Sequence, residues 1–349
     1  MQKKRDCHLI YTGGTIGMRN SQQGLTPAAD SIAQYLKLQN WHHQITLESA
    51  AQLIDSSALS FSHWNNYLDL IYAHLESNTG VVLLHGTDTL AYTAAMLSLL
   101  FSNPPAPIIV TGSNWPLADS HSDAPTNLFS AIIAAQTLPA AVYVVFNSRL
   151  LLASDCVKVS SQHPDAFMTP HCIDLGRYNA RSECWNYIKL PNLFSNRQET
   201  VSEKFRFNTS VRVLNFFLVP GGGDDLADLL MANIAWDGII IQSMGDGNFP
   251  LSLTVKKALS FFLQQNKPVL NVSQTLDARV KKIYRANQDI AGCGVLNTDR
   301  LSFAFCYAAL ITALSTAPQQ SIALLKQWIK VRNIYYQTIN KLVLDVSSA

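Results

Sequence analysis

Residues 81–100, VVLLHGTDTLAYTAAMLSLL, contain the pattern that decides the fold. An apolar run at 81–85 breaks at Gly86 and polar residues, and a second apolar stretch of helical character follows. The same order begins again in PIIVTGS (107–113) and in DGIIIQSMG (237–245). Buried strands that alternate with helices predict an α/β architecture with largely parallel sheets.

The length of the chain predicts more than one domain. At 349 residues it exceeds what one hydrophobic core usually supports. A polar, poorly periodic segment separates two series of strands and helices. We therefore predict a larger N-terminal α/β domain at 1–190 with a mixed, mainly parallel sheet. A linker at 191–210 and a smaller C-terminal α/β domain at 211–349 are expected to follow.

Composition argues against several classes of protein. The net charge of +2 is far from the strongly basic balance of a nucleic-acid binder, so no nucleic-acid partner is expected. Six scattered cysteines predict reduced thiols in a cytoplasmic protein. The basic start of the chain leads into only a very short apolar run, so no signal peptide is expected.

One uncharged segment, Leu128 to Phe146, is long enough to span a bilayer. Gln136, Thr137 and Pro139 interrupt it, and its character changes there from alanine-rich to AVYVVF. We therefore expect a helix, a turn and a buried strand, and no contact with a membrane.

Two threonine-bearing loops follow predicted strands, YTGGT at 11–15 and HGTD at 85–88. The carboxyl ends of parallel strands meet at one edge of a sheet, where ligands bind. Taken alone, HGTD fits an ordinary capped turn into a helix. The first loop suggests phosphate binding, but its glycines match neither the dinucleotide nor the P-loop spacing.

A threonine hydroxyl is a weak nucleophile until a base takes its proton. One such base is a neutral lysine that a carboxylate orients. Asp88 and Lys158 are the candidates, because each follows a predicted strand. An isolated lysine is more often a solvated surface residue, and spacing alone leaves the pairing open.

Together, YTGGTIGM (11–18) and LLHGTDTLAYTA (83–94) resemble the two signature motifs of the bacterial L-asparaginases, and the type I cytoplasmic branch most closely. The resemblance continues in DSS (55–57), VTGSNWPLADSHSD (110–123) and SMGDGNFP (243–250). It implies that the chain hydrolyses the side-chain amide of L-asparagine to L-aspartate and ammonia. It also implies a homodimer or homotetramer and no metal or organic cofactor.

The same resemblance implies roles for individual residues. Thr15 is expected to be the nucleophile that forms an acyl-enzyme, and Thr87 the second catalytic threonine, in a triad with Asp88 and Lys158. Asp88 is also expected to bind the α-ammonium of the substrate, and Asn248 to reach the site of a neighbouring subunit. The expected substrate-binding residues are Asp55, Ser56, Ser57, Thr87, Asp88, Ser113 and Asn248.

The chain departs from the type I pattern after the nucleophile. A lid stretch resembling Q-G-Y-I-P is here QGLTP at 23–27, so Leu25 replaces a tyrosine whose hydroxyl helps to move a proton. Two alternatives therefore stay open: a catalytically weakened protein that binds or senses an amino acid, and an amidase or glutaminase with a different amide substrate.

Overall fold

The computed structural model divides the chain into two compact units, Met1–Arg206 and Phe207–Ala349, and each is described by itself. The linker predicted at 191–210 lies largely outside the described residues and stays a prediction. The residues that the structure describes are 4–22, 24–39, 45–75, 79–188, 190, 204–232, 235–280 and 285–347.

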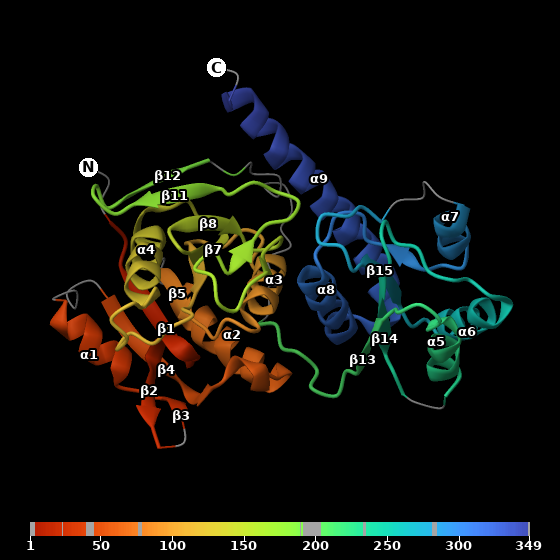
Figure 1. The fold of residues 1–349 in the computed structure, drawn as a ribbon, viewed down its shortest axis with the longest axis horizontal. Helices are drawn as coiled ribbons and strands as arrows, with labels where there is room; N and C mark the ends of the chain where they lie inside the picture. Colours follow the sequence, from red (N-terminus) through yellow and green to blue (C-terminus); the bar gives the residue numbers. More distant parts are fainter. Residues whose placement is uncertain are drawn as a thin grey trace. The chain divides into compact units, whose positions relative to one another are not determined.

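The N-terminal unit is built on one large sheet (Figure 1). Its strands are β1 (Cys7–Gly13), β4 (Ile45–Ile54), β5 (Gly80–Leu84), β6 (Ile108–Thr111), β7 (Val142–Phe146), β8 (Arg149–Leu152), β11 (Gly176–Asn179) and β12 (Cys184–Tyr187). Within the described residues the order is β12-β11-β8-β7-β6-β5-β1-β4. The pairs from β4 to β7 are parallel, and those from β7 to β12 are antiparallel. The predicted mixed, mainly parallel sheet is confirmed.

Helices cover both faces of this sheet (Figure 1). They are α1 (Ser31–Leu38), α2 (Phe61–Leu75), α3 (Leu90–Leu100) and α4 (Ala124–Thr137). On one face, Trp64 of α2 donates a hydrogen bond to Thr93 of α3 at 2.8 Å. On the other face, the rings of Tyr35 in α1 and Phe129 in α4 lie with their centroids 6.0 Å apart. This double covering explains why β5, β6 and β7 consist almost entirely of apolar residues.

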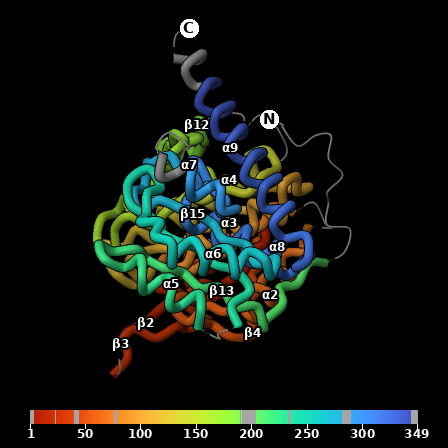
Figure 2. Tube along the Cα trace, turned by 90° about the vertical axis from the view of Figure 1, so that its right-hand side faces the viewer, coloured from red at the N-terminus to blue at the C-terminus, as the bar shows by residue number. Residues whose placement is uncertain are grey.

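Short elements join the sheet to its loops. The single-turn helices η1 (Thr15–Gly17) and η2 (Ser56–Ala58) follow β1 and β4. The strands β2 (Met18–Ser21) and β3 (Gly24–Pro27) pair as an antiparallel hairpin that projects from the N-terminal unit (Figures 1 and 2). A second small ladder pairs β9 (Val157–Lys158) with β10 (Phe167–Met168).

The C-terminal unit has its own parallel sheet, in the order β13-β14-β15-β16 within the described residues. Buried side chains of β14 pack with those of α5 and α6 in one core, so a second α/β domain is confirmed. The elements are β13 (Val213–Phe217), α5 (Gly223–Met231), β14 (Gly238–Ser243), α6 (Leu253–Gln264), β15 (Val269–Ser273), α7 (Arg285–Gly292), β16 (Leu296–Asn297), α8 (Phe303–Thr316), η3 (Pro318–Gln320) and α9 (Ser321–Ser347).

The uncharged segment between Leu128 and Phe146 is not one continuous helix. Helix α4 ends at Thr137, and strand β7 begins at Val142 after a turn, as the sequence predicts. Across the part of the chain that the structure describes, every helix is too short or too polar to cross a membrane.

Candidate active site

Loops from four neighbouring strands meet at the carboxyl edge of the N-terminal sheet, after β4, β1, β5 and β6. Such an edge is where parallel sheets bind ligands. At the end of β1, the Thr12 hydroxyl donates a hydrogen bond to the carbonyl of Leu84 in β5 at 2.9 Å. The Thr12 hydroxyl therefore links two strands. Thr15 lies in the loop after β1 and is half-buried.

Glycines let these loops pack backbone against backbone. Gly14 has φ +76°, a conformation that L side chains rarely adopt, and a Cβ atom there would clash with the backbone of Gly86. A Cβ atom on Gly86 would in turn clash with the side chain of Ser56. The loops that contain Thr15, Ser56 and Thr87 are therefore held together at distances that only glycine permits.

Lys158 joins the second threonine to a carboxylate. Its Nζ lies 2.8 Å from the Thr87 Oγ1 and 2.7 Å from the Asp88 Oδ1, close enough for two hydrogen bonds. Thr87 is buried and the Lys158 side chain is 19% exposed, whereas that of Asp88 is 59% exposed. The structure thus brings together three residues that sequence spacing could not connect, with the carboxylate on the solvent side.

A buried aspartate holds the segment that contains Lys158. The Asp155 carboxylate accepts hydrogen bonds from the backbone N–H groups of His171 and Cys172 at 2.8 and 2.9 Å. It also lies 2.9 Å from the His171 Nδ1. Burial raises the pKa of Asp155, partly offset by these contacts. Asp155 was not predicted from the sequence, although an acidic residue inside the mostly apolar run LLASDCV (151–157) indicates a buried carboxylate.

His85 fixes the turn that precedes Thr87. Its Nδ1 lies 2.8 Å from the Gly86 carbonyl, and its Nε2 lies 3.0 Å from the Thr93 hydroxyl. Burial lowers the pKa of His85 to about 4, so the ring is neutral near pH 7. These partners assign the proton to Nδ1, which donates to the carbonyl. His85 therefore positions the loop, because its single ring proton is donated to the Gly86 carbonyl.

The predicted carboxylate-binding loop lies beside the second threonine loop. Asp55 caps η2, because its Oδ1 accepts hydrogen bonds from the backbone N–H and the hydroxyl of Ser57, both at 2.9 Å. The Thr89 hydroxyl donates to the Ser56 carbonyl at 2.8 Å. Ser56 is buried, whereas Asp55 and Ser57 are exposed to solvent.

Models of known families match both units of the chain. The family described as Asparaginase, N-terminal, matches residues 6–189, and Glutaminase/Asparaginase C-terminal domain matches residues 212–328. The chain belongs to the asparaginase family of amidohydrolases. The family membership that the two threonine loops predict is thereby confirmed.

Individual asparaginases are similar to the chain over most of its length. L-asparaginase 1 of Escherichia coli K12 is 31% identical over 85% of this chain and 87% of its own. The structure of L-asparaginase I from Vibrio cholerae aligns with a TM-score of 0.79 at 28% identity, over 93% of this chain and 97% of its own. The thermostable L-asparaginase from Thermococcus kodakarensis aligns with a TM-score of 0.79 at 25% identity, over 92% and 96%.

Two further residues predicted from the asparaginase resemblance are Ser113 and Asn248. Ser113 follows β6 and is buried, and its hydroxyl donates to the Trp115 carbonyl at 2.6 Å. Asn248 belongs to the C-terminal unit, where its backbone N–H bonds to the Met244 carbonyl at 2.8 Å after β14. The substrate-binding roles of Ser113 and Asn248 stay predictions.

Leu25, at the place of the lid tyrosine, lies on the hairpin that follows the Thr15 turn. It pairs with Asn20 across the β2–β3 ladder, and it is 46% exposed. A leucine in this position presents apolar surface to solvent and supplies no hydroxyl for proton transfer. The replacement of the lid tyrosine by Leu25 therefore lies on the exposed strand β3, in the hairpin that follows η1.

Proposed function

We propose that this chain hydrolyses the side-chain amide of L-asparagine to L-aspartate and ammonia through a threonine acyl-enzyme. The contact of Lys158 with both Thr87 and Asp88 is the observation that supports this most strongly. A buried hydroxyl, an amine and a carboxylate in series form an arrangement that can carry protons to and from a reacting amide. The packing of the Thr15 loop against the Thr87 loop, glycine to glycine, supports a shared site.

The substrate is a zwitterion, so the site needs an anion for the α-ammonium and hydrogen-bond donors for the α-carboxylate. Asp88, with its exposed carboxylate, is the proposed partner of the ammonium. The loop at 55–57 is the proposed carboxylate-binding segment, next to Asp88 through the Thr89–Ser56 hydrogen bond. The Ser57 hydroxyl would exchange its bond to Asp55 for one to the substrate carboxylate. The side-chain amide then extends toward the two threonines.

Two chemical steps follow from this arrangement. In the first, the Thr15 oxygen attacks the amide carbon, the C–N bond breaks, and the threonine proton leaves with the nitrogen as ammonia. An ester between Thr15 and the aspartyl group remains. In the second step water attacks this ester, one water proton returns to Thr15, and aspartate is released.

Lys158 is proposed to move the protons in these steps through Thr87. A fully protonated amine donates to the Thr87 oxygen at the observed distance of 2.8 Å. Once Nζ has lost a proton, the bond can reverse, and the amine accepts the hydroxyl proton of Thr87. Asp88, 2.7 Å away, holds the amine in place during both states.

The assay is ammonia release from L-asparagine by the purified protein, with L-glutamine measured in parallel. We expect Thr15→Ala and Thr87→Ala each to lower turnover by at least about three orders of magnitude. The extra methylene of glutamine is worth about 1–3 kcal/mol, so slower hydrolysis of glutamine is also expected. Wild-type protein no more active than Thr15→Ala would refute the proposal.

Leu25 favours a second candidate, an asparaginase-family protein that binds the amino acid and turns it over slowly. Its exposed leucine lacks the hydroxyl expected there, and general acid–base groups contribute about 10²–10⁴-fold to a rate. We expect Leu25→Tyr to raise kcat by at least about tenfold, while Leu25→Phe, which adds the ring alone, does not. An equal effect of the two variants would show that the hydroxyl is irrelevant.

A further inference from the structure

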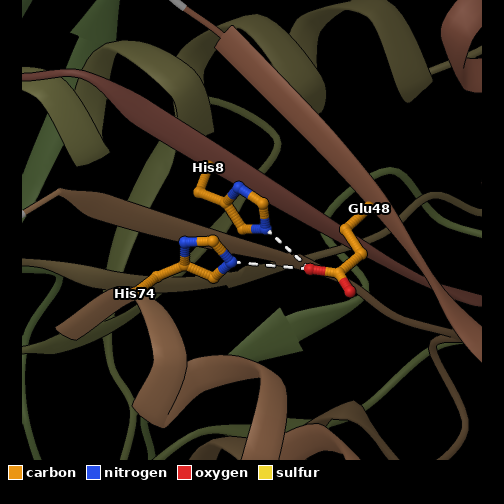
Figure 3. A group of neighbouring side chains, drawn as sticks. All are labelled: His8, Glu48 and His74. Carbon is orange, nitrogen blue, oxygen red and sulfur yellow. Dashed lines mark hydrogen bonds and ion pairs between the residues drawn. The ribbon is translucent and has the colours of Figure 1, made fainter. Parts of the chain in front are cut away.

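Three potential metal ligands from distant parts of the sequence converge on the face of the N-terminal sheet that α2 covers (Figure 3). His8 lies at the amino end of β1, Glu48 on the edge strand β4, and His74 in the last turn of α2. His8 is therefore at the opposite end of β1 from Thr15. The proposed hydrolysis does not use this cluster.

The two imidazoles present the same nitrogen to one carboxylate oxygen (Figure 3). The Glu48 Oε2 lies 3.4 Å from the His8 Nε2 and 3.5 Å from the His74 Nε2. Good hydrogen bonds between nitrogen and oxygen span about 2.7–3.2 Å, so these contacts are long. Ligand atoms of a tetrahedral zinc ion, each about 2.0–2.1 Å from the metal, lie about 3.3 Å apart. Both nitrogen–oxygen distances therefore match the separation of two ligand atoms on one ion, and all three ligand atoms lie within 4.8 Å of one another.

His8 is already arranged as a metal ligand. Its side chain is 6% exposed, and its buried Nε2 has, among the described residues, only the long contact to Glu48. The Nδ1 lies 2.6 Å from the Thr46 hydroxyl, which can accept the ring proton when Nε2 binds an ion. In that tautomer the Nε2 lone pair is directed at the cluster. A hydrogen bond on the far nitrogen is the usual support of a metal-bound histidine.

We propose that His8, Glu48 and His74 bind a divalent transition-metal ion of the zinc type, with water as the remaining ligand. Two imidazoles and one carboxylate suit zinc, whereas magnesium and calcium prefer oxygen ligands. His74 and Glu48 are 25% and 45% exposed, so this side of the site is open to water. The imidazoles stack with centroids 3.2 Å apart, so coordination requires the more exposed His74 to turn its lone pair toward the ion.

The ion would connect three elements. It would hold the edge strand β4 and the end of helix α2 to the neighbouring strand β1. The loop at 55–57 lies between β4 and α2 in sequence, so both of its flanking elements would be fixed. The expected effect is a more stable N-terminal unit, since an ion that binds only the folded state stabilises it.

The test is zinc titration of tag-free, chelator-treated full-length protein by calorimetry, with Co²⁺ absorption as a report on ligand geometry. We expect one equivalent of Zn²⁺ to bind and Co²⁺ to give the intense visible bands of a tetrahedral site. Both Glu48→Gln and His74→Gln should weaken Zn²⁺ binding by at least about tenfold. Zn²⁺ should also raise the unfolding temperature of the wild type, and less so that of the two variants.

His63→Gln is the matched control, because His63 is a partly exposed histidine of the same helix outside the cluster. It should leave both the affinity for Zn²⁺ and the thermal shift unchanged. Absence of stoichiometric Zn²⁺ binding by the wild type would overturn the proposal. So would His74→Gln binding as tightly as the wild type. The unfolding temperature of each variant in chelator shows whether that variant is folded. Glu48→Gln and His74→Gln each remove a different ligand, so either variant alone tests the site.

Discussion

The contacts of Lys158 could not be predicted from its position in the sequence alone. Its neighbours in the sequence suggest an ordinary lysine after a strand, and its partners Thr87 and Asp88 lie 71 and 70 positions away. Only the fold, which brings the ends of β5 and β9 together, produces the two short contacts. The resemblance to asparaginases implied that Thr87 and Asp88 are the partners of Lys158. The distances from its Nζ to their side-chain oxygens agree with that expectation.

Removing the amine tests this contact at the residue scale. We expect Lys158→Met to lower kcat for L-asparagine by about 10²–10⁴-fold with a smaller change in KM, because the proton relay is lost while the substrate contacts remain. Lys37→Met, which changes an exposed lysine of α1, should have wild-type kinetics. Steady-state ammonia release measures both variants, and a Lys158→Met enzyme with unchanged kcat would refute the relay.

At the scale of elements, local periodicity predicted much of the N-terminal sheet. The order of strand, loop and helix over residues 81–146 gave β5, α3, β6, α4 and β7, since each is encoded by its own apolar pattern. The placement of β1 between β4 and β5 was not predictable in this way, because it depends on contacts between distant segments. The His8–Glu48–His74 cluster escaped notice for the same reason.

Close packing of the glycine loops gives a prediction for Gly14. We expect Gly14→Ala to abolish activity and to lower the free energy of unfolding by about 1–3 kcal/mol, because the new methyl group meets the Gly86 backbone at positive φ. Gly221→Ala is the matched control, since Gly221 also has positive φ but open space around it. Chemical denaturation and ammonia release measure both. Equal losses in the two variants would mean that backbone strain, not loop packing, is responsible.

The junction of β5 and α3 predicts a pH dependence of stability. Histidine in the unfolded chain titrates near pH 6.5, whereas burial lowers the pKa of His85 to about 4 in the folded protein. Between these values the unfolded chain binds a proton that the folded chain does not. The free energy of unfolding should therefore fall as the pH drops through this window, by up to about 3 kcal/mol from His85.

Denaturant unfolding between pH 7 and pH 4.5 measures this contribution. We expect His85→Asn to be less stable at pH 7 and to lose less stability on acidification, because the titrating ring is gone. His121→Asn, which changes a histidine with a 95% exposed side chain, should follow the wild-type curve. Parallel curves for the wild type and His85→Asn would show that His85 does not titrate in this range.

At the scale of the whole molecule, alternation of strands and helices predicted two α/β units, and both are present. The assembly of subunits is not encoded in any such pattern. We propose from the family resemblance that Asn248 completes the site of a neighbouring subunit in a homodimer or homotetramer. Asn248 is partly exposed in its own unit, so its side chain can be reached from outside that unit.

Mixing two variants tests this proposal. Thr15→Ala and Asn248→Ala should each be far less active than the wild type. In dimers reassembled from equal amounts of the two, half of the molecules contain one complete site, so about one quarter of the wild-type activity per subunit should return. Ammonia release before and after subunit exchange gives the result. No recovery in confirmed mixed dimers would place Asn248 outside the neighbouring site.

The most direct test of the central claim is to locate the covalent intermediate. Lys158→Met protein is mixed with L-asparagine, quenched in acid and digested, and the peptides that contain Thr15 and Thr87 are compared by mass spectrometry. We expect an aspartyl ester on Thr15 and none on Thr87, and no adduct when Thr15→Ala is added to the variant. An aspartyl ester on Thr87 in place of Thr15 would contradict the claim.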